Sequence, residues 1–508
     1  MAISADGEHL TIEKVVKVAR EREPVEIPEE NIERVRQCRK IVEDKINKQE
    51  VMYGINTGIG ELSEVVLAPD QLQDFQRYLI YSHTAGYGDP VAEDDARAAM
   101  LSRLNVLCKG HSGLRVIVVQ TLKEMLNRGV TPVMCQRGSV GACGDLSPLG
   151  QMALVVMGEG EAFFEGERLP GREAMTRAGV EPLVFEARDG LATINGSNLT
   201  TGMGSLQLYD ARRLVKTAEI AAAMSLEALN ANMTAYDERI HKARGYRGSI
   251  DCAENIRRIT EGSELLKQGR KKVQDSYCMR STPQVIGPAK ETIDFAEGLF
   301  LVELNGVGDN PIFFNDDGGT CLTGANFQGT PLAFGLEFTG TAITTIAALS
   351  ERRSNRLMNP HLSSGLPAFL TKGAGMFSGM MLTQYTQGAL VCENRVLSHP
   401  AATGSIPAAA DQEDFVSMSM TTAIKTKQII RNAEAVVAIE LMGAAQGIDF
   451  RGDIKRGKGT QAAHEIIREN VEFLDKDRPL NNDINRMANV VREGKVLEAV
   501  EKAIGALK

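Results

Sequence analysis

The sequence predicts a mainly α-helical protein built around a long central bundle of helices. Long segments rich in Ala, Leu and Ile carry good helix formers and few internal breakers. They cover residues 205–233, 331–358, 378–395 and 418–447. In the stretch from Ala433 to Met442 the charged residues are Glu434 and Glu440. A helix that is apolar on nearly every face belongs inside a bundle or a subunit interface, so we expect oligomerisation to bury it further.

Two shorter elements are also predicted outside the bundle. Between residues 112 and 129, apolar side chains recur at helical spacing, with Ser112 as the predicted N-cap and Gly129 as the left-handed stop. Residues 162–167, Ala-Phe-Phe-Glu-Gly-Glu, are typical of a hairpin tip. We expect three domains: a mixed N-terminal domain over 1–200 that carries the loop Gly138 to Gly150, the central helical bundle over 201–450, and a C-terminal helical tail over 451–508.

Composition excludes several classes of protein. With 508 residues, 43% hydrophobic and 24% charged, the chain can bury a large core and is not a disordered or fibrous sequence. Its net charge of −9 argues against nucleic acid or an anionic membrane as the main partner. The N-terminus does not have the pattern of a secretory signal, and no stretch supplies the roughly 18 consecutive apolar residues of a membrane span. We therefore expect a cytoplasmic protein.

Cysteine and histidine spacing does not favour a metal site or a disulfide framework. The eight cysteines form no CxxC pair, and the seven histidines form no HExxH motif. Most of the cysteines are expected to be small buried hydrophobic residues. Cys143 is the exception.

Glycine and polar residues gather where a bundle should have few of them. The clusters are Tyr53 to Gly60, Gly138 to Gly150, Asn195 to Asn198 and Asn305 to Pro311. Glycine permits unusual backbone angles, and loops on a rigid scaffold are common places for functional sites. Several such clusters in one chain favour a site built from loops.

The triplet Ala142-Cys143-Gly144 can generate a reactive group from the backbone itself. If the chain bends sharply, the Gly144 nitrogen can reach the Ala142 carbonyl carbon and close a five-membered ring. A Cβ on residue 144 would crowd that approach. Loss of the β-substituent of Cys143 then leaves an exocyclic C=CH₂, an electrophile that no ordinary side chain supplies.

The run Gly138-Ser-Val-Gly-Ala-Cys-Gly-Asp-Leu-Ser-Pro-Leu149 resembles the signature of the aromatic amino acid ammonia-lyase and aminomutase family. That family carries the prosthetic group 4-methylidene-imidazol-5-one (MIO), formed from Ala-Ser-Gly, and its fold is ammonia-lyase/fumarase-like. Cys143 departs from the family's serine. Loss of sulfide from cysteine gives the same dehydroalanine as loss of water from serine, so we expect the ring to form.

The resemblance covers residues 10 to 483 with the family's motifs in order. The matching segments are Tyr53 to Gly58, Leu191 to Asn198, Val273 to Arg280, Pro283 to Val285, Asp309 to Pro311, Asn326-Phe327 and Gln412 to Asp414. Separated motifs in a shared order identify a family far better than one motif does.

The resemblance implies a role for each matched residue in eliminating ammonia from an L-α-amino acid. Tyr53 would be the general base at the β-carbon, which requires a lowered pKa near neutral pH. Tyr277 would assist proton movement, and Arg280 would hold the substrate carboxylate with two hydrogen bonds. Asn195 and Gln274 would orient the MIO and the carboxylate, and Phe327 would pack at the site.

Two positions indicate the substrate. Ser82-His83 resembles the selectivity pair of histidine ammonia-lyases, and Glu413 is also the histidine-type residue at its position. A polar pocket that bonds a ring N–H discriminates well against an apolar ring. The sequence therefore favours conversion of L-histidine to trans-urocanate, with Glu413 as a catalytic residue and His83 as a substrate-binding residue.

Other assignments stay open at this point. Gln328, Asp411 and Gly308 replace the family's usual His, Asn and Ser, and the N-terminal region also resembles tyrosine 2,3-aminomutases. A tyrosine or phenylalanine ammonia-lyase, or a tyrosine 2,3-aminomutase, is therefore an alternative. A protein whose Cys143 does not cyclise would be an inactive assembly or binding protein. The resemblance also implies a homotetramer whose active sites are shared between subunits.

Overall fold

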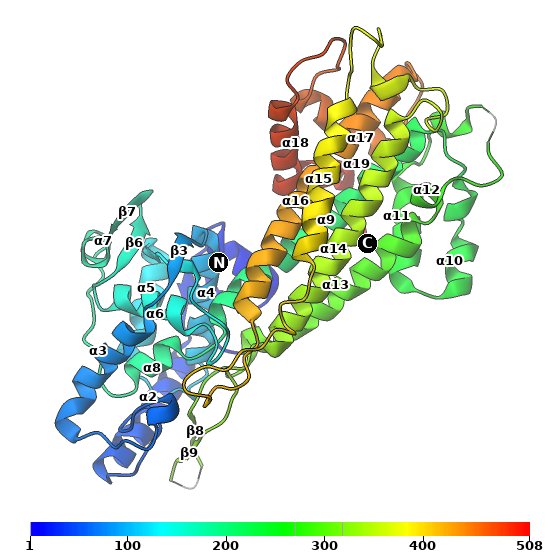
Figure 1. Ribbon diagram of the computed structural model, residues 1–508. Coiled ribbons are helices and arrows are strands. Elements are labelled where there is room, and N and C mark those ends of the chain that lie inside the picture. The colour runs from blue at the N-terminus through cyan, green and yellow to red at the C-terminus, as the bar shows by residue number, and fades with distance from the viewer. Residues whose placement is uncertain (1, 270, 317) are drawn as a thin grey trace. The chain divides into compact units, whose positions relative to one another are not determined.

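The computed structural model describes residues 2–269, 271–316 and 318–508, and helices dominate it (Figure 1). The predicted mainly helical fold is therefore confirmed. Contacts divide the chain into two compact units. The first unit comprises Met1–Tyr209, Ala296–Glu337 and Pro400–Ile424, and the second comprises Asp210–Phe295, Phe338–His399 and Lys425–Lys508. The three domains expected from the sequence stay a prediction.

The first unit combines short strands with medium-length helices. Its helices are α1 (Ile12–Ala19), α2 (Glu29–Asn47), α3 (Leu72–His83), α4 (Glu93–Leu107), α5 (Val116–Arg128), α6 (Leu146–Val156), α7 (Gly171–Arg177) and α8 (Asp189–Ile194). The parallel pair is β1 (Ile3–Ser4) with β2 (Val25–Glu26), and the antiparallel pairs are β3 (Tyr87–Pro90) with β5 (Cys135–Arg137) and β8 (Ile312–Phe314) with β9 (Thr320–Leu322). Nearly every residue of α4 is buried.

The predicted hairpin is present and belongs to a three-stranded sheet. Strands β6 (Glu161–Phe164) and β7 (Glu167–Pro170) pair antiparallel, and β4 (Thr131–Pro132) lies on the other side of β6. The turn residues Glu165 and Gly166 both have positive φ, at 51° and 81°. That is the geometry of the tight turns that join right-twisted strands.

The helix predicted from Ser112 begins later, at Val116, and Ser112 is not its N-cap. Gly113 turns the chain with φ +75°, where a Cβ would lie 2.5 Å from a Val42 methyl. Asp189, from another helix, caps this end instead by accepting the Arg115 N–H at 3.0 Å. The predicted left-handed stop at Gly129 is confirmed, with φ 80°.

The long helices run side by side, and most of each one belongs to the second unit (Figure 1). They are α9 (Asn198–Ala228), α13 (Thr282–Asn305), α14 (Thr330–Met358), α15 (Met381–Leu397) and α16 (Ser419–Phe450). The shorter helices are α10 (Glu238–Arg244), α11 (Arg247–Ile259), α12 (Tyr277–Arg280), α17 (Lys458–Asn470), α18 (Asn481–Glu493) and α19 (Lys495–Ile504). The predicted bundle is confirmed. The sequence analysis missed α13, which contains Pro288, a residue that ordinarily breaks a helix.

The buried carboxylate of Glu440 in the bundle is paired with an arginine. Glu440 of α16 is fully buried and accepts hydrogen bonds from Arg353 Nη2 of α14 at 2.8 Å and from Ser225 of α9 at 2.7 Å. A carboxylate in an apolar helix face is tolerated because a cation and a hydroxyl satisfy it.

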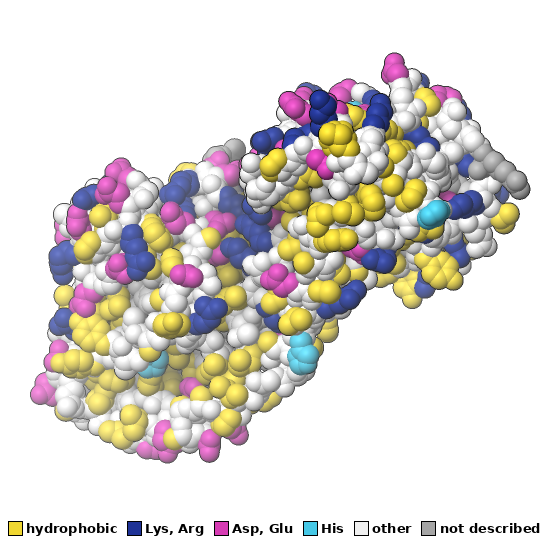
Figure 2. Space-filling model, turned by 45° about the horizontal axis from the view of Figure 1, so that its top comes forward, with side chains coloured by type: hydrophobic (Ala, Val, Ile, Leu, Met, Phe, Trp, Pro, Cys, Tyr) yellow, Lys and Arg dark blue, Asp and Glu magenta, His cyan; other side chains and the backbone are white. Residues whose placement is uncertain are grey.

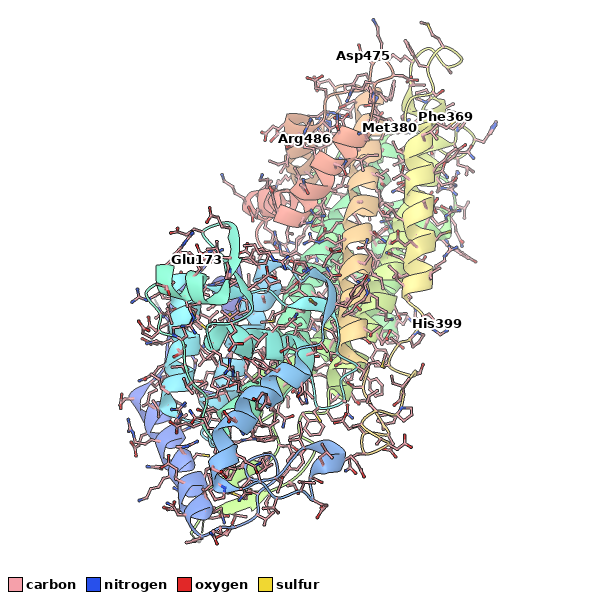
Figure 3. The ribbon with its side chains drawn as sticks, turned by 60° about the vertical axis from the view of Figure 1, so that its left-hand side comes forward. Glu173, Phe369, Met380, His399, Asp475 and Arg486 are labelled. Atoms are coloured by element: carbon pink, nitrogen blue, oxygen red, sulfur yellow. The ribbon has the colours of Figure 1, made fainter. Side chains whose placement is uncertain are left out.

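Helix α14 has the length and apolar composition of a membrane span, with a mean hydropathy of 1.4 over its most apolar window. Most of that window, 61%, is buried within the protein. A core helix of a water-soluble bundle has the same properties. In the segment after α14, the Met380 N–H donates to the Phe369 carbonyl at 2.9 Å, and Figure 3 labels both residues.

Candidate active site

The loop that carries Ala142, Cys143 and Gly144 is curled around the Ser139 hydroxyl. Gly141 and Gly144 adopt left-handed angles, with φ +77° and +78°. The Ser139 hydroxyl lies 3.2 Å from the Gly144 carbonyl oxygen, to which it donates, and it accepts the Gly141 N–H at 3.1 Å. The segment is therefore bent, and closure of the Gly144 nitrogen on the Ala142 carbonyl carbon stays a prediction.

Gly144 lies against the Asn195-Gly196 segment so closely that no other residue fits. A Cβ at position 144 would stand 2.1 Å from the Gly196 carbonyl carbon. The next residue, Asp145, donates its N–H to the Gly196 oxygen at 2.8 Å. Two segments predicted to lie at the site are thus joined by backbone contact.

Asp145 fastens the loop to the first turn of α9. Its fully buried carboxylate accepts the Thr200 N–H at 2.7 Å and the Thr200 hydroxyl at 3.2 Å. Burial raises the pKa of Asp145 to about 6, although these hydrogen bonds oppose the shift. A carboxylate at a helix N-terminus is stabilised by the unpaired N–H groups there.

Glu413 approaches the loop from the segment between residues 400 and 419. The Cys143 thiol donates to Glu413 Oε1, with 3.0 Å between sulfur and oxygen. Backbone contacts fix this arrangement: Met418 N–H donates to the Val140 carbonyl at 2.9 Å, and Ala408 pairs with Glu413 as an isolated antiparallel bridge. Burial and, secondly, Glu413 raise the pKa of the Cys143 thiol well above its ordinary value. The sulfur is thus a protonated thiol near neutral pH and not a reactive thiolate.

Tyr53 lies in the same environment. Its phenol oxygen accepts the Gly60 N–H at 3.0 Å. The lowered pKa expected from the sequence is wrong: burial raises the pKa of Tyr53, the nearby Cys143 and Glu413 raise it further, and the Gly60 N–H only partly offsets them. The sequence analysis foresaw a donor but not the depth of burial.

A buried ion cluster holds Asn195 in place. The Asp309 carboxylate accepts hydrogen bonds from Arg188 Nη2 at 2.9 Å and from Arg103 Nη2 at 3.1 Å. All three side chains are fully buried. The Asn195 amide donates to the Asn310 carbonyl at 2.6 Å, while its Oδ1 is buried with no hydrogen-bond partner in the described structure. The sequence analysis missed both arginines, although an arginine two residues after the apolar run Ala98 to Leu101 of α4 is a signal that could have found Arg103.

His83 ends helix α3 with one ring nitrogen already bonded. Its Nδ1 lies 2.7 Å from the Leu79 carbonyl and 3.0 Å from the Ser82 hydroxyl. Because a carbonyl can only accept, Nδ1 carries the proton in the neutral ring, and Nε2 is then an acceptor. Phe327, also in the first unit, is half-buried, and its carbonyl accepts the Ser197 hydroxyl at 2.8 Å.

Gln274, Tyr277 and Arg280 belong to the second unit. Gln274 and Arg280 line a pocket of about 300 Å³ together with Asn232, Asp275 and Gln284, all from that unit. The Arg280 guanidinium carbon stacks 4.7 Å from the centre of the Tyr277 ring, and Tyr277 is 73% exposed. The structure thus places Tyr53, His83, Ala142, Cys143, Gly144, Asn195, Phe327 and Glu413 in the first unit and the Gln/Tyr/Arg block in the second.

The residues around the loop fit the MIO group. Position 144 excludes a Cβ, Cys143 carries a β-leaving group, and the unpartnered Oδ1 of Asn195 leaves a buried polar atom beside Gly196. Asn195 and Asp145 are therefore the residues that would hold and orient such a group.

Comparison with known proteins identifies the family and the fold. Residues 10–469 match the family model for aromatic amino acid lyase. A histidine ammonia-lyase from Alkaliphilus oremlandii is 48% identical, with 99% of each chain covered, and one from Caldanaerobacter subterraneus is 45% identical, with 98% of each covered. Among solved structures, tyrosine aminomutase from Streptomyces globisporus superposes with a TM-score of 0.96 at 35% identity and complete coverage of both chains. Histidine ammonia-lyase from Trypanosoma cruzi gives 0.92 at 35% identity, covering 99% of this chain and 96% of that one.

Proposed function

The chain belongs to the aromatic amino acid lyase family, and on that premise we propose that it eliminates ammonia from L-histidine to give trans-urocanate. The observation that carries the proposal is the bent loop at residues 142–144, where Gly144 admits no side chain and the Cys143 thiol contacts Glu413. The relatives of 42–48% identity named histidine ammonia-lyase support histidine as the substrate. A cytoplasmic location is part of the proposal.

We propose that an MIO group forms from Ala142, Cys143 and Gly144 and supplies an electrophile for the substrate. Tyr53 removes the proton from the substrate β-carbon, and Glu413 pairs with the substrate ammonium and takes up one of its protons. His83 presents Nε2 as an acceptor for the imidazole N–H. Arg280 binds the carboxylate, Gln274 and Asn195 orient the reacting groups, Tyr277 assists proton movement, and Phe327 packs at the site.

Substitution of His83 by leucine tests the substrate assignment. Without Nε2, a buried imidazole N–H of the substrate would lose its acceptor, which costs about 1–3 kcal/mol, or roughly 5- to 150-fold in kcat/KM for L-histidine. Activity toward L-phenylalanine is expected to rise relative to L-histidine. Both are measured as initial rates of ultraviolet absorbance.

A matched control for this variant is Ser82→Ala. It removes one acceptor of Nδ1 but keeps the stronger contact to the Leu79 carbonyl, so the His83 tautomer and the activity are expected to change little. If His83→Leu keeps the parental preference for histidine, the assignment of this side chain is wrong.

The pH dependence follows from Tyr53. A phenol acts as a base only when ionised, and burial raises the pKa of Tyr53, so its ionised fraction near neutrality is small. That fraction increases roughly tenfold per pH unit below the pKa. We expect kcat/KM to climb as pH rises above neutrality, and Tyr53→Phe to abolish both the activity and the slope. A profile that is flat or falling across this range would exclude Tyr53 as the base.

The alternative substrate is tyrosine. It is favoured by the tyrosine aminomutase structures, which superpose closely on this chain. Parallel assays with L-histidine, L-tyrosine and L-phenylalanine decide between the two. A β-amino acid product would identify a mutase.

We also propose a homotetramer with shared active sites. Large apolar side chains stand exposed at the surface of the single chain, and Figure 2 shows such patches on one face. The most exposed of them in the described structure are Val273, Met376, Tyr87, Val396, Val302 and Tyr277. Exposed apolar surface of this kind favours association with another protein surface. Light scattering should give a mass close to four chains.

A further inference from the structure

Cys143 differs from the serine of related proteins in the group that must leave during ring formation. A serine would lose water, whereas Cys143 must lose its sulfur. The side chain that meets this sulfur is Glu413, 3.0 Å away. Glu413 therefore contacts the leaving atom before any substrate is bound.

We propose that Glu413 acts first in the maturation of the protein, as the acid that protonates the departing Cys143 sulfur so that it is released as hydrogen sulfide. This inference rests on the proposed function, because it concerns the formation of the prosthetic group that the function requires. It gives Glu413 a second role, separate from its contact with the substrate ammonium.

The step balances without an external oxidant or reductant. After the Gly144 nitrogen has closed on the Ala142 carbonyl carbon with loss of water, the Cα proton of residue 143 leaves to solvent. Its electron pair becomes the new Cα=Cβ bond, and the Cβ–Sγ bond breaks with its pair on sulfur. Glu413, which accepts the thiol hydrogen at first, takes up a proton from solvent before the bond breaks. The sulfur keeps its own proton and takes this second one from the Glu413 carboxyl. The products are the exocyclic methylidene and H₂S.

The surroundings of the thiol explain why a positioned acid is needed. Burial and Glu413 together raise the pKa of Cys143, so the sulfur keeps its proton until the bond breaks. An ionised thiolate could leave only as a sulfide dianion, which is a far poorer leaving group. Hydrosulfide leaving without a second proton would put a negative charge beside the Glu413 carboxylate in a mostly buried site, which is unfavourable. Proton transfer from Glu413 lets the sulfur leave as neutral H₂S, so neither a sulfide dianion nor a buried hydrosulfide anion forms.

The protein holds Glu413 for this contact through its backbone. Ala408 and Glu413 exchange both backbone hydrogen bonds, at 2.9 and 3.1 Å, across a turn in which Ala409, Ala410 and Asp411 have positive φ. Three consecutive non-glycine residues in the left-handed region are unusual and are retained where the surrounding structure requires them. Replacement of the Glu413 side chain leaves these backbone bonds in place.

The test follows maturation itself. The full chain is produced by cell-free synthesis without substrate, and its intact mass and released sulfide are recorded over time for the parent, Glu413→Gln and Glu413→Asp. We expect Glu413→Gln to slow the combined loss of water and hydrogen sulfide by at least about tenfold, since general acids contribute 10²–10⁴-fold. Glu413→Asp retains a carboxyl group and is expected to mature faster than Glu413→Gln.

Two further variants sharpen the test. Asp411→Asn removes an exposed negative charge from the same turn, at a position where asparagine tolerates the positive φ, and it should mature at the parental rate. In Cys143→Ser the leaving group is hydroxide, which needs an acid more than hydrosulfide does. Glu413→Gln should therefore slow maturation by a larger factor in the serine background than in the parent.

The outcomes separate this inference from the proposed function. If the parent matures and Glu413→Gln matures equally fast, the role of Glu413 is overturned while the proposed function stands. If Glu413→Gln slows maturation by the same factor in the cysteine and serine backgrounds, the role of Glu413 is also overturned. If the parent keeps the mass of its unmodified sequence, the proposed function fails and this inference fails with it.

Discussion

A Cys143→Ala variant is expected to fold like the parent and to lose activity by a factor on the order of 10³ or more, because the prosthetic group supplies chemistry that side chains cannot. The Cβ of alanine is a methyl group with no substituent to expel, so the exocyclic C=CH₂ cannot form. The thiol makes one side-chain hydrogen bond in the described structure, to Glu413, and its removal leaves the backbone bends at Gly141 and Gly144 in place. Urocanate formation measures the activity, and thermal unfolding measures the stability.

The matched variant is Cys143→Ser, which restores the family's usual triplet and retains a β-leaving group. It is expected to mature and to remain active. The pair thus compares presence and absence of a leaving group at one position. If Cys143→Ala keeps activity comparable to Cys143→Ser, residue 143 does not form the catalytic group.

The second large effect is expected on stability, from Asp309→Asn. This carboxylate is the counter-ion of both Arg103 and Arg188, and all three side chains are fully buried. Asparagine fills the same volume but leaves two buried guanidinium groups without a negative charge. Breaking a buried ion pair in this way costs about 3–5 kcal/mol. In chemical denaturation, the lower free energy of unfolding should appear as a lower denaturant concentration at the midpoint, with an unchanged m-value.

Glu161→Gln is the control for that measurement. It breaks an ion pair with Arg168 on the exposed hairpin, where both side chains are about half exposed. Exposed pairs contribute about 0–1 kcal/mol, so little change is expected. If Asp309→Asn and Glu161→Gln lose similar amounts of unfolding free energy, Asp309 does not neutralise the charge of the buried arginines. Because Asn195 contacts the same cluster, Asp309→Asn should also lower activity.

The sequence predicts the helical bundle well because its long segments are apolar on most faces and rich in helix formers. It fails at two places. Helix α13 continues through Pro288, although proline ordinarily ends a helix. Helix α5 begins at Val116, and its start is bonded to Asp189, which lies 74 positions beyond Arg115 and leaves no trace in the local sequence.

At the site, too, features that depend on the local sequence can be predicted, and features that depend on residues distant in sequence cannot. Glycine at position 144 follows from the chemistry of ring closure, and the structure supplies a second reason, the contact with Gly196. The raised pKa of Tyr53 could not be foreseen, because it depends on burial and on Cys143 and Glu413, which are distant in sequence. The buried arginines that support Asn195 were missed for a similar reason, since their partner Asp309 lies more than a hundred positions away.

The central claim is that residues 142–144 close into an electrophilic ring with loss of the Cys143 sulfur. High-resolution diffraction from freshly purified, fully active protein tests it most directly. Density for a five-membered ring with an exocyclic carbon, and none for sulfur at residue 143, is the predicted result. An open peptide with an intact thiol 3.0 Å from Glu413 in active protein would contradict the account.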